Sequence, residues 1–586
     1  MPNDIELFID NRPVRVPAGS TILQACKAAG VDIPTLCHME KVSSNASCGI
    51  CVVELEGAKS LVRSCVQAAS PGLKVQSASP RVMEARRTVT ELLLANHPDD
   101  CLSCLRNNSC ELQAIAERMG VRKKPFPRTR KPAKPDTIGL AIMRDNDKCI
   151  LCGRCVAVCR ETQGVSAIDF AGRGVRSHIA PFMDKALSQS VCVSCGLCTL
   201  VCPTGALTER DECDEVFAEL YDPKKVVVVQ TAPAIRASLG EALGLEPGSL
   251  VTGKMASALR RLGFDKVFDT QFTADLTIME EGSELLHRLG NGGTLPMITS
   301  CSPGWINFIE TFYPSLLPHL SSCKSPQQMF GALAKSYWAE KAGVDPASVV
   351  VVSIMPCTAK KHEAKRPEMR DAWLWWKEKG AESEPYFDVD YALTTRELAR
   401  MIRRAGIDFA GLPEEDFDDP LGRSTGAATI FGATGGVMEA AARTAYELVT
   451  GKALPGIELE AVRGFDGIRD AELDMNGTKL KVAVAHTLKN ARALLDGIAA
   501  GTSPYAFIEV MSCPGGCLGG GGQPVSTDWK KREARRQAIY REDRSLPERK
   551  SHDNPSVQVL YKEFLGKPLG HLSHELLHTE YKQRSV

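Results

Sequence analysis

The sequence lacks any excess of one charge, since Lys plus Arg and Asp plus Glu each total 71 of its 586 residues. Composition therefore gives no argument for a nucleic acid or an anionic membrane as a partner. No apolar run approaches the length that spans a bilayer, and the first residues, MPNDIELFID, lack the charged-then-apolar order of a signal peptide. We therefore expect a cytoplasmic protein with no nucleic-acid and no membrane partner.

Nucleotide-binding motifs are also lacking. The sequence has no Walker A loop and no GxGxxG after a strand, and the run Gly519 to Gly522 is not followed by a phosphate-binding lysine. Cysteine, in contrast, is abundant, with 22 residues. Thiols stay reduced in the cytosol, so in a chain without an export signal these cysteines predict metal ligands rather than disulfides. The length of the chain predicts several domains.

Residues 1–80 alternate short strand-like runs with one helical run, as in a small mixed α+β domain. Gaps of ten, two and thirteen residues separate the cysteines of this region, which are Cys37, Cys48, Cys51 and Cys65. One CxxC with a further cysteine on each side suits a 2Fe-2S cluster. The alternative is a zinc ribbon, although zinc usually takes paired CxxC knuckles. In the next region, residues 81–125, the spacing of His97, Cys101, Cys104 and Cys110 is by itself compatible with a Cys3His zinc site.

Residues 140–215 carry the strongest single motif. Cys192, Cys195, Cys198 and Cys202, followed by Pro203, have the spacing of a bacterial two-cluster ferredoxin, and the run Cys149, Cys152, Cys155 and Cys159 repeats it without the proline. In such pairs the fourth cysteine of each run ligates the other cluster. The pattern therefore predicts one 4Fe-4S cluster on Cys149, Cys152, Cys155 and Cys202, and another on Cys192, Cys195, Cys198 and Cys159.

Residues 224–524 alternate buried strand-like and helical runs, which predicts an α/β domain. Three strand-like runs end in cysteine-bearing loops: 295–299 before Cys301 and Ser302, 349–354 before Cys357, and 506–511 before Cys513 and Cys517. Ligands bind at the carboxyl ends of strands in such sheets, so we expect the three loops to converge on one crevice. The tail, residues 525–586, is polar and helical. Its histidines, at positions 571, 574 and 578, predict a surface or packing feature rather than a metal site.

The three loops resemble the signatures of iron-only (FeFe) hydrogenases, T-S-C-C-P-x-W, M-P-C-x-x-K and E-x-M-x-C-x-x-G-C-x-x-G-G-G-x-P. The second and third match completely. The resemblance implies a multidomain α+β and α/β fold. It would consist of a ferredoxin-like β-grasp domain (1–80), a His-ligated cluster domain (81–125), a two-cluster ferredoxin domain (140–215), a large α/β catalytic domain (224–524) and a helical segment similar to the family's small subunit (525–586).

The resemblance also assigns cofactors. The first two domains are similar to those of the large iron-sulfur subunit of NADH dehydrogenase, in which the site matched by His97, Cys101, Cys104 and Cys110 is a 4Fe-4S cluster with one imidazole ligand. The implied set is one 2Fe-2S cluster, three 4Fe-4S clusters and the H-cluster, a 4Fe-4S cubane joined to a two-iron subcluster with CO, cyanide and a bridging dithiolate. Cys357, Cys513 and Cys517 match cubane ligands, and Lys360 matches the lysine that hydrogen-bonds a cyanide. The family's cofactor-lining positions are matched by Met355, Met511, Phe431, Ala232, Pro233 and Pro326.

The family's proton relay is matched, from the cluster outward, by Cys301, Glu281, Ser321, Glu284 and Arg288. Glu281 and Glu284 are three residues apart on an expected helix, so they share a face as relay carboxylates must. Without the resemblance, two solvated glutamates would be the simpler interpretation.

The first loop departs from the family pattern, because Ser302 stands where the fourth cubane ligand is expected. Iron prefers thiolate to alkoxide, so this change should weaken the site. Three replacements remain open: Cys301 rotates inward, Cys323 supplies a thiolate from outside the motif, or Ser302 itself ligates. A plain buried thiol is the alternative interpretation for Cys323.

The sequence thus predicts an enzyme that reversibly reduces protons to dihydrogen, similar to ferredoxin-dependent and NAD(P)-linked members of the family. Expected partners are ferredoxin, or flavoprotein subunits that oxidise NAD(P)H, together with hydrogenase maturation proteins. Two alternatives remain: Ser302 could mark a hydrogen-sensing, regulatory hydrogenase, or the chain could be a non-catalytic iron-sulfur assembly or electron-transfer protein, similar to hydrogenase-like proteins that hold only ordinary clusters. The complete relay argues against the first, and Lys360 argues against the second.

Overall fold

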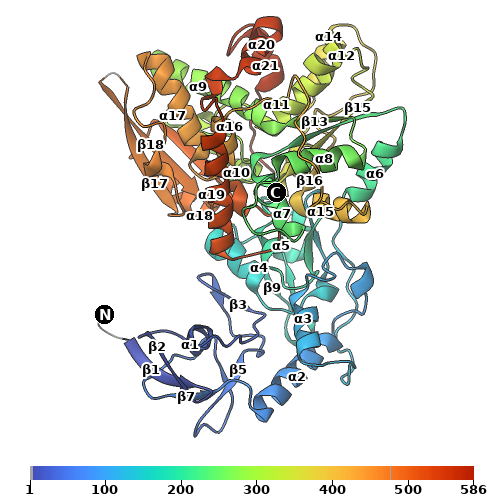
Figure 1. Ribbon diagram of the computed structural model, residues 1–586, viewed down its shortest axis with the longest axis vertical. Coiled ribbons are helices and arrows are strands. Elements are labelled where there is room, and N and C mark those ends of the chain that lie inside the picture. Colours follow the sequence, from blue (N-terminus) through green and yellow to red (C-terminus); the bar gives the residue numbers. More distant parts are fainter. Residues whose placement is uncertain (1–3, 476, 586) are drawn as a thin grey trace. The chain divides into compact units, whose positions relative to one another are not determined.

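A computed structural model describes residues 4–475 and 477–585 (Figure 1). The chain divides into two compact units. The first unit comprises Met1–Thr162, Ser166–Ser190 and Val201–Thr208, and the second comprises Gln163–Val165, Val191–Leu200 and Glu209–Val586. Among the described residues, no helix combines the length and the apolar character needed to cross a membrane.

The first unit begins with a five-stranded sheet in the order β2-β1-β7-β5-β6. Its strands are β1 (Asp4–Ile9), β2 (Arg12–Pro17), β5 (Val52–Leu55), β6 (Val62–Arg63) and β7 (Lys74–Gln76). Alternate residues of β1, Leu7 and Ile9, point into a core that they share with helix α1 (Ile22–Ala28). Helix α1 begins with a capping box formed by Thr21 and Gln24. A sheet with one helix packed on it is the mixed α+β arrangement that the sequence predicts.

Apart from helix α2 (Pro80–Ala95), the rest of the first unit is built from short elements joined by long loops. They are the strands β3 (His38–Met39) and β4 (Ser43–Ser44), helices α3 (Glu111–Arg118) and α4 (Arg154–Ala157), strand β8 (Ile142–Arg144), which pairs with β11 (Leu207–Glu209), and the antiparallel pair β9 (Asp169–Ala171) and β10 (His178–Ala180). So little regular structure encloses only a small apolar core, which is typical of domains that are held together by metal clusters.

The second unit contains two four-stranded sheets. The first sheet, in the order β13-β12-β15-β16, is parallel throughout and consists of β12 (Val226–Thr231), β13 (Lys266–Asp269), β15 (Val349–Met355) and β16 (Tyr391–Thr394). Val350 and Val352 pack on one side, against α8 (Thr252–Leu262) and α15 (Thr395–Arg404). Val349 and Val351 pack on the other, against α9 (Thr270–Asn291) and α11 (Pro326–Leu333). Burial on both faces explains the continuous valine runs of these strands.

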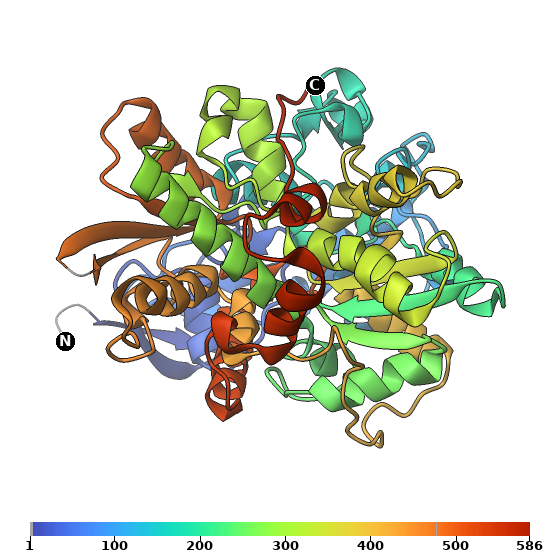
Figure 2. The same cartoon turned by 90° about the horizontal axis from the view of Figure 1, so that it is seen from above.

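The second sheet, in the order β14-β19-β18-β17, consists of β14 (Met297–Ile298), β17 (Ile468–Met475), β18 (Thr478–His486) and β19 (Phe507–Met511). Strands β14, β19 and β18 are parallel, and β17 is antiparallel to β18. Helix α9 also contributes Ala274 and Ile278 to the core of this sheet, beside α17 (Gly436–Thr450). Figure 2 shows α9 and α17 side by side on this part of the unit. Because α9 packs on both sheets, it is buried over most of its length.

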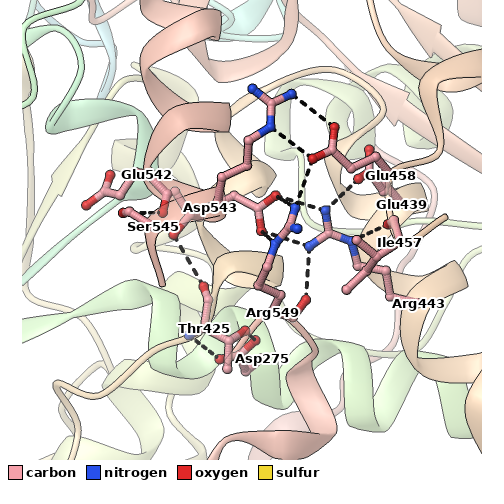
Figure 3. A network of polar contacts seen from close by, with 12 residues as sticks. Asp275, Thr425, Glu439, Arg443, Ile457, Glu458, Glu542, Asp543, Ser545 and Arg549 are labelled. Carbon is pink, nitrogen blue, oxygen red and sulfur yellow. Dashed lines mark hydrogen bonds and ion pairs between the residues drawn. The ribbon is translucent and has the colours of Figure 1, made fainter. Parts of the chain in front are cut away.

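The tail is an integral part of the second unit. It contains α19 (Trp529–Ser545), α20 (Pro555–Leu560) and α21 (His571–Leu577), and Leu560, Leu576 and Leu577 belong to the core around α9 and α11. On α19, the fully buried Asp543 accepts hydrogen bonds from Arg443 at 2.9 and 3.0 Å and from Arg549 (Figure 3). Residues from α17 and from the tail thus form one buried ionic network, which ties the C-terminal segment to the α/β domain.

The remaining helices of the described second unit connect these layers. They are α5 (Leu197–Val201), which begins in this unit, α6 (Cys213–Tyr221), α7 (Leu239–Ala242), α10 (Pro303–Phe312), α12 (Ala339–Ala342), α13 (Ala359–Glu363), α14 (Asp371–Glu378), α16 (Gly426–Thr429) and α18 (Leu488–Ala499). The arrangement places the ends of β14, β15 and β19, and so all three cysteine-bearing loops, next to α9.

Candidate metal centres and proton relay

The four cysteines of the first domain lie together. The thiols of Cys37 and Cys48 are neighbours, and so are those of Cys51 and Cys65. Cys37 also interacts electrostatically with Cys51 and Cys65. Four converging thiols match the donor set of a 2Fe-2S cluster.

The surroundings of His97 suit a metal ligand. Its Nδ1 lies 3.0 Å from the carbonyl oxygen of Pro98, and its buried Nε2 has no hydrogen-bond partner among the described residues. A hydrogen bond from Nδ1–H leaves Nε2 with a free lone pair, which is the usual arrangement of a ligating histidine. Burial, together with the charge of Lys124, lowers the pKa of His97 and so favours the neutral ring, although the Pro98 bond opposes this. Cys101, Cys104 and Cys110 follow His97 in the same unit.

One cavity of the first unit is lined by all four cysteines predicted for a single cluster: Cys149, Cys152, Cys155 and Cys202. Cys202, from the second run, thus lies with three cysteines of the first run, as the predicted exchange of the fourth cysteine requires, and Cys159 is not among the lining residues.

The other predicted ligand set is divided between the two units, since Cys159 belongs to the first and Cys192, Cys195 and Cys198 to the second. Within the second unit, the Cys192 segment is fixed by hydrogen bonds. Arg584 donates to the Cys192 carbonyl at 2.8 Å and Thr358 Oγ1 donates to the Ser194 carbonyl at 2.7 Å. A side chain at Gly521 would meet the Cys195 carbonyl oxygen at 2.2 Å, so the glycine run permits this segment to approach the third loop.

The three loops of the α/β domain converge on one cavity in the second unit. Its lining includes Cys301, Ser302, Cys357, Lys360, Cys513 and Cys517. All six positions that the resemblance assigns to the lining are present as well, namely Ala232, Pro233, Pro326, Met355, Phe431 and Met511. Cys323 is not among the lining residues of this cavity.

Ser302 begins helix α10 at the wall of this cavity. Its Oγ lies 2.8 Å from Ser512 Oγ and accepts a hydrogen bond from the Ser512 N–H at 3.3 Å. Gln163 Nε2 in turn donates to the Ser512 carbonyl at 2.9 Å. The Ser302 hydroxyl is therefore held beside Cys513 in the third loop, and not turned away from the loops that carry the other candidate ligands.

Lys360 reaches the cavity from α13 and is held by a buried ion pair. Its Nζ donates to Glu363 Oε2 at 2.8 Å and to the Cys301 carbonyl at 3.3 Å. Glu363 also accepts hydrogen bonds from Ser325 Oγ and Gln327 Nε2. Sequence reasoning missed Glu363 and Gln327. Glu363 lies three residues after Lys360, so the helical spacing was an available signal.

The expected relay residues Glu281 and Glu284 lie on α9, and both are buried. Burial, together with the charge of Glu284, raises the pKa of Glu281 to about 8. Neither carboxyl oxygen of Glu281 makes a hydrogen bond of standard geometry to a described residue, although Ser321 and the Ser300 N–H are its polar neighbours. Glu281 is therefore a carboxyl group that can carry its proton at neutral pH.

The outer part of the relay is hydrogen-bonded. Ser321 Oγ donates to Glu284 Oε2 at 3.0 Å, and Arg288 Nε donates to Glu284 Oε1 at 3.1 Å. At the inner end, Cys301 lines the cavity and interacts electrostatically with Glu281. Burial, the Glu281 charge and neighbouring groups raise the pKa of the Cys301 thiol well above its ordinary value, so this thiol is also protonated.

Cys323 lies on the outer side of the relay and is fully buried. Its Sγ is 3.9 Å from Glu284 Oε2 and 4.0 Å from His578 Nδ1. Burial and the charges of Glu284, Glu281 and Glu280 raise the pKa of this thiol well above its ordinary value. Its neighbours are thus those of a neutral buried thiol.

The tail histidines differ from one another. His571 and His574 are exposed, whereas His578 is buried and bonded on both ring nitrogens. The sequence-based expectation of a surface or packing feature describes His571 and His574, and it missed the polar contacts of His578.

Comparison with known proteins identifies the family. Residues 225–521 match the family model described as iron only hydrogenase large subunit, C-terminal domain, and residues 529–584 match the iron hydrogenase small subunit. The chain belongs to the iron-only hydrogenases. The remaining regions match a 2Fe-2S iron-sulfur cluster binding domain (3–80), the NADH-ubiquinone oxidoreductase-G iron-sulfur binding region (86–125) and the ferredoxin-like domain of NADH-quinone oxidoreductase subunit 3 (139–208).

Three relatives of this hydrogenase illustrate the range of similarity. It is 51% identical to the NADP-reducing hydrogenase subunit HndD of Solidesulfovibrio fructosivorans, over 99% of each chain. It is 40% identical to iron hydrogenase 1 of Clostridium pasteurianum, over 96% of this chain and 97% of that one. The solved apo FeFe-hydrogenase HydA1 of Chlamydomonas reinhardtii is 46% identical, with a TM-score of 0.57, and matches 64% of this chain and all of its own.

The cavity of this hydrogenase fits an iron-sulfur centre in its donor chemistry. Burial raises the pKa of the Cys357 thiol to about 11 and that of Cys517 to about 12, so without a cation these thiols are neutral. A cationic cluster reverses this preference and converts such thiols to thiolate ligands. Three thiols and the Ser302 hydroxyl therefore supply four potential donors, and one donor differs from the family pattern. The chain is a hydrogenase with 2Fe-2S, 4Fe-4S and H-cluster domains.

Proposed function

We propose that this chain is the hydrogen-converting subunit of an NAD(P)-linked hydrogenase, and that its H-cluster is held by Cys357, Cys513, Cys517 and Ser302. The observation that carries the proposal is the convergence of these four side chains and Lys360 on one cavity. The contacts of Ser302 with the third loop favour it over Cys323 as the replacement for the fourth thiolate. When bound, the two-iron group supplies a low-potential metal at which electrons and protons meet.

The other side chains of the cavity position and protect this group. Lys360, fixed by Glu363, would offer its ammonium group as a charge-assisted hydrogen-bond donor to a cyanide ligand of the bound group. Met355, Met511 and Phe431 make the wall apolar and exclude water. The accessory sites, which we assign to one 2Fe-2S and three 4Fe-4S clusters, carry electrons to the cavity.

Protons travel along the relay in the proposed scheme. Cys301 exchanges a proton at the cavity, Glu281 accepts and returns it as a neutral acid, and Ser321 passes it to Glu284 through the observed hydrogen bond. Arg288 holds Glu284 at the outer end of the relay. Cys301, Glu281, Ser321 and Glu284 act as positioned proton donors and acceptors, which is the role that their burial and mutual contacts support, and Arg288 acts only by positioning Glu284.

The electron partner is proposed from the relative that reduces NADP. The similarity to that subunit extends over 99% of each chain, and the present sequence contains no nucleotide-binding motif, so the nicotinamide would bind to a flavoprotein partner. The H-cluster would be completed by maturation proteins, and we propose that the complex functions in the cytoplasm. A ferredoxin is the alternative donor, and purification of the complex from its native host distinguishes the two. Co-purifying flavin and NAD(P)H-dependent hydrogen production support the proposal, whereas activity with ferredoxin alone refutes it.

An infrared spectrum of the matured protein tests the active site. Metal-bound CO and cyanide bands are expected in the wild type and in Cys323→Ala. Ser302→Cys should keep the bands, whereas Ser302→Ala should weaken or shift them, because only the latter removes a donor. Loss of the bands in Cys323→Ala, with Ser302→Ala unchanged, would instead make Cys323 the ligand. Bands without appreciable turnover would indicate a regulatory hydrogenase, and absence of bands in every variant would leave a non-catalytic electron-transfer protein.

A further inference from the structure

The relay carboxylate Glu284 has a second polar neighbour, which comes from the C-terminal segment. Ser322 Oγ lies 3.2 Å from Glu284 Oε2 and 2.8 Å from His578 Nδ1. The backbone of this region pairs antiparallel with the tail at Cys323 and His578, and the Thr579 N–H donates to the Ser322 carbonyl at 2.8 Å. Glu284, Ser322 and His578 thus form a continuous hydrogen-bonded row.

The far side of His578 is bonded to a buried carboxylate. His578 Nε2 lies 3.2 Å from Glu280 Oε2, which also accepts the Leu569 N–H at 2.8 Å, while Tyr561 donates its hydroxyl proton to Glu280 Oε1 at 2.6 Å. Burial disfavours the ionised form of Glu280, but these hydrogen bonds outweigh that effect and lower the pKa of Glu280. An ionised carboxylate can only accept, so the proton on His578 Nε2 is fixed.

Two proton arrangements satisfy this row without movement of a heavy atom. In the first, His578 is a cation whose Nδ1–H donates to Ser322 Oγ, and the Ser322 hydroxyl donates to the Glu284 carboxylate. In the second, Glu284 is protonated and donates to Ser322 Oγ, and the Ser322 hydroxyl donates to neutral His578. The two arrangements differ by one proton, which passes between Glu284 and His578 by exchange of the Ser322 hydroxyl proton.

We propose that Ser322 and His578 form a side branch of the proton relay, in which His578 takes up a proton from Glu284 and returns it. Each dihydrogen consumes two protons, and the branch stores one of them beside the relay while the other is delivered. The Glu280 carboxylate balances the charge of the stored proton. This proposal rests on the proposed relay through Glu281 and Glu284.

The groups that face His578 allow it to hold a charge. Besides Glu280 and Glu284, the titratable neighbours are the Cys323 thiol, which stays neutral, Tyr561, which bonds Glu280, and His574, whose ring centroid lies 4.5 Å from that of His578. Arg288 is paired with Oε1 of Glu284, whereas Ser322 Oγ is bonded to Oε2. His578 itself is almost completely buried, so exchange with solvent does not compete directly with exchange along the row.

The test compares Ser322→Ala with Ser322→Thr in the matured holoenzyme, assayed for hydrogen production with a reduced viologen dye. Alanine breaks the row and leaves the backbone bonds to Glu284, whereas threonine keeps the hydroxyl. We expect the rate of hydrogen production to fall about ten-fold in Ser322→Ala and in His578→Gln. This is less than the roughly 100-fold fall that is typical when a positioned acid or base on a main relay is lost. Ser322→Thr should restore the wild-type rate, and the double variant should be no slower than either single one. The exposed His571→Gln is the matched control.

An infrared difference spectrum of the protonated carboxyl band of Glu284, assigned by its loss in Glu284→Gln, gives a readout independent of turnover. Breaking the row in Ser322→Ala or in His578→Gln should change this band, and Ser322→Thr should restore it. Wild-type rates in Ser322→Ala, or equal losses in the alanine and threonine variants, would overturn the branch. Wild-type rates in Glu281→Gln would overturn the relay itself, so the two failures are distinguishable.

Discussion

The buried carboxyl of Glu281 gives the sharpest prediction, because its neutralisation should stabilise the protein and inactivate the enzyme at the same time. Glu281 is 1% exposed, and its carboxyl oxygens have no hydrogen-bond partner of standard geometry among the described residues. Ionisation in this environment is unfavourable, which raises the pKa from 4.5 to about 8. Glu281→Gln replaces the acid by a neutral side chain of nearly the same shape.

The sign of the stability effect follows from this raised pKa. Below about pH 4.5 the carboxyl is neutral in both the folded and the unfolded protein, and it costs nothing. Between pH 4.5 and 8 it ionises in the unfolded chain only, so the wild type loses stability as the pH rises. At about 1.4 kcal/mol per pKa unit, the full cost above pH 8 is about 5 kcal/mol. Glu281→Gln has no such cost.

The assay compares the urea midpoints of the two proteins under anaerobic conditions from pH 5 to pH 9. The variant should gain stability relative to the wild type as the pH rises, and the difference should level off above about pH 8. Asp275 and Glu509, whose pKa values are each raised to about 7, are present in both proteins and cancel in the comparison. His287→Gln, an exposed change on the same helix, is the control and should show no such trend.

Hydrogen production by the matured variant should fall about 10² to 10⁴-fold, as for loss of a positioned proton-transfer group. The infrared bands of the metal-bound CO and cyanide should remain, which separates a failed relay from a lost cofactor. A stability difference that does not change with pH would refute the raised pKa of Glu281. Wild-type turnover would remove Glu281 from the relay.

Three further changes test other parts of the molecule. Asp543→Asn removes the buried carboxylate that Arg443 and Arg549 share and leaves them only their partners Glu439 and Glu458. The buried network then carries an excess positive charge, so the free energy of unfolding, measured by denaturant titration, should fall by about 3–5 kcal/mol. An effect no larger than that of the partly exposed Asp553→Asn would contradict this. Glu363→Gln removes the partner that holds Lys360, so activity or cofactor retention should fall about 10 to 100-fold, and unchanged infrared bands and turnover would argue against that role. His97→Cys replaces a neutral ligand by an anionic one, so it should lower the reduction potential of one accessory cluster in an EPR-monitored redox titration. If the reduction potentials of all four accessory clusters were unchanged, His97 would not be a ligand.

The metal-binding motifs and the core strands could be predicted from the sequence because their signals are local. A cluster needs several thiols within a few ångströms, and closely spaced cysteines such as Cys149, Cys152 and Cys155 meet that need with little help from the rest of the chain. Valine runs such as 349–352 indicate a strand buried on both faces, and β15 is such a strand. The convergence of the first and third loops also follows from the parallel pairing of β14 and β19, whereas the second loop follows β15 of the other sheet and joins them through the packing of the two sheets.

Contacts between distant parts of the chain could not be predicted in this way. Ser302 bonds Ser512, which lies 210 residues away, and His578 contacts residues that precede it by 255 to 298 positions. No periodicity or spacing connects such pairs, because their meeting depends on how α9, the second sheet and the tail pack together. The separation of Cys323 from the cofactor cavity is a result of the same packing.

The sequence by itself determined which chemistry this protein performs, since the identity and local spacing of the cysteines, Lys360 and the glutamates select an iron-only hydrogenase with a departure at Ser302. Only the tertiary structure decided how that chemistry is supported. It placed the Ser302 hydroxyl against the third loop, fixed Lys360 through Glu363, and brought His578 to Ser322 beside Glu284. These functions depend on distances of about 3 Å between groups far apart in the chain, and only the packed core sets such distances.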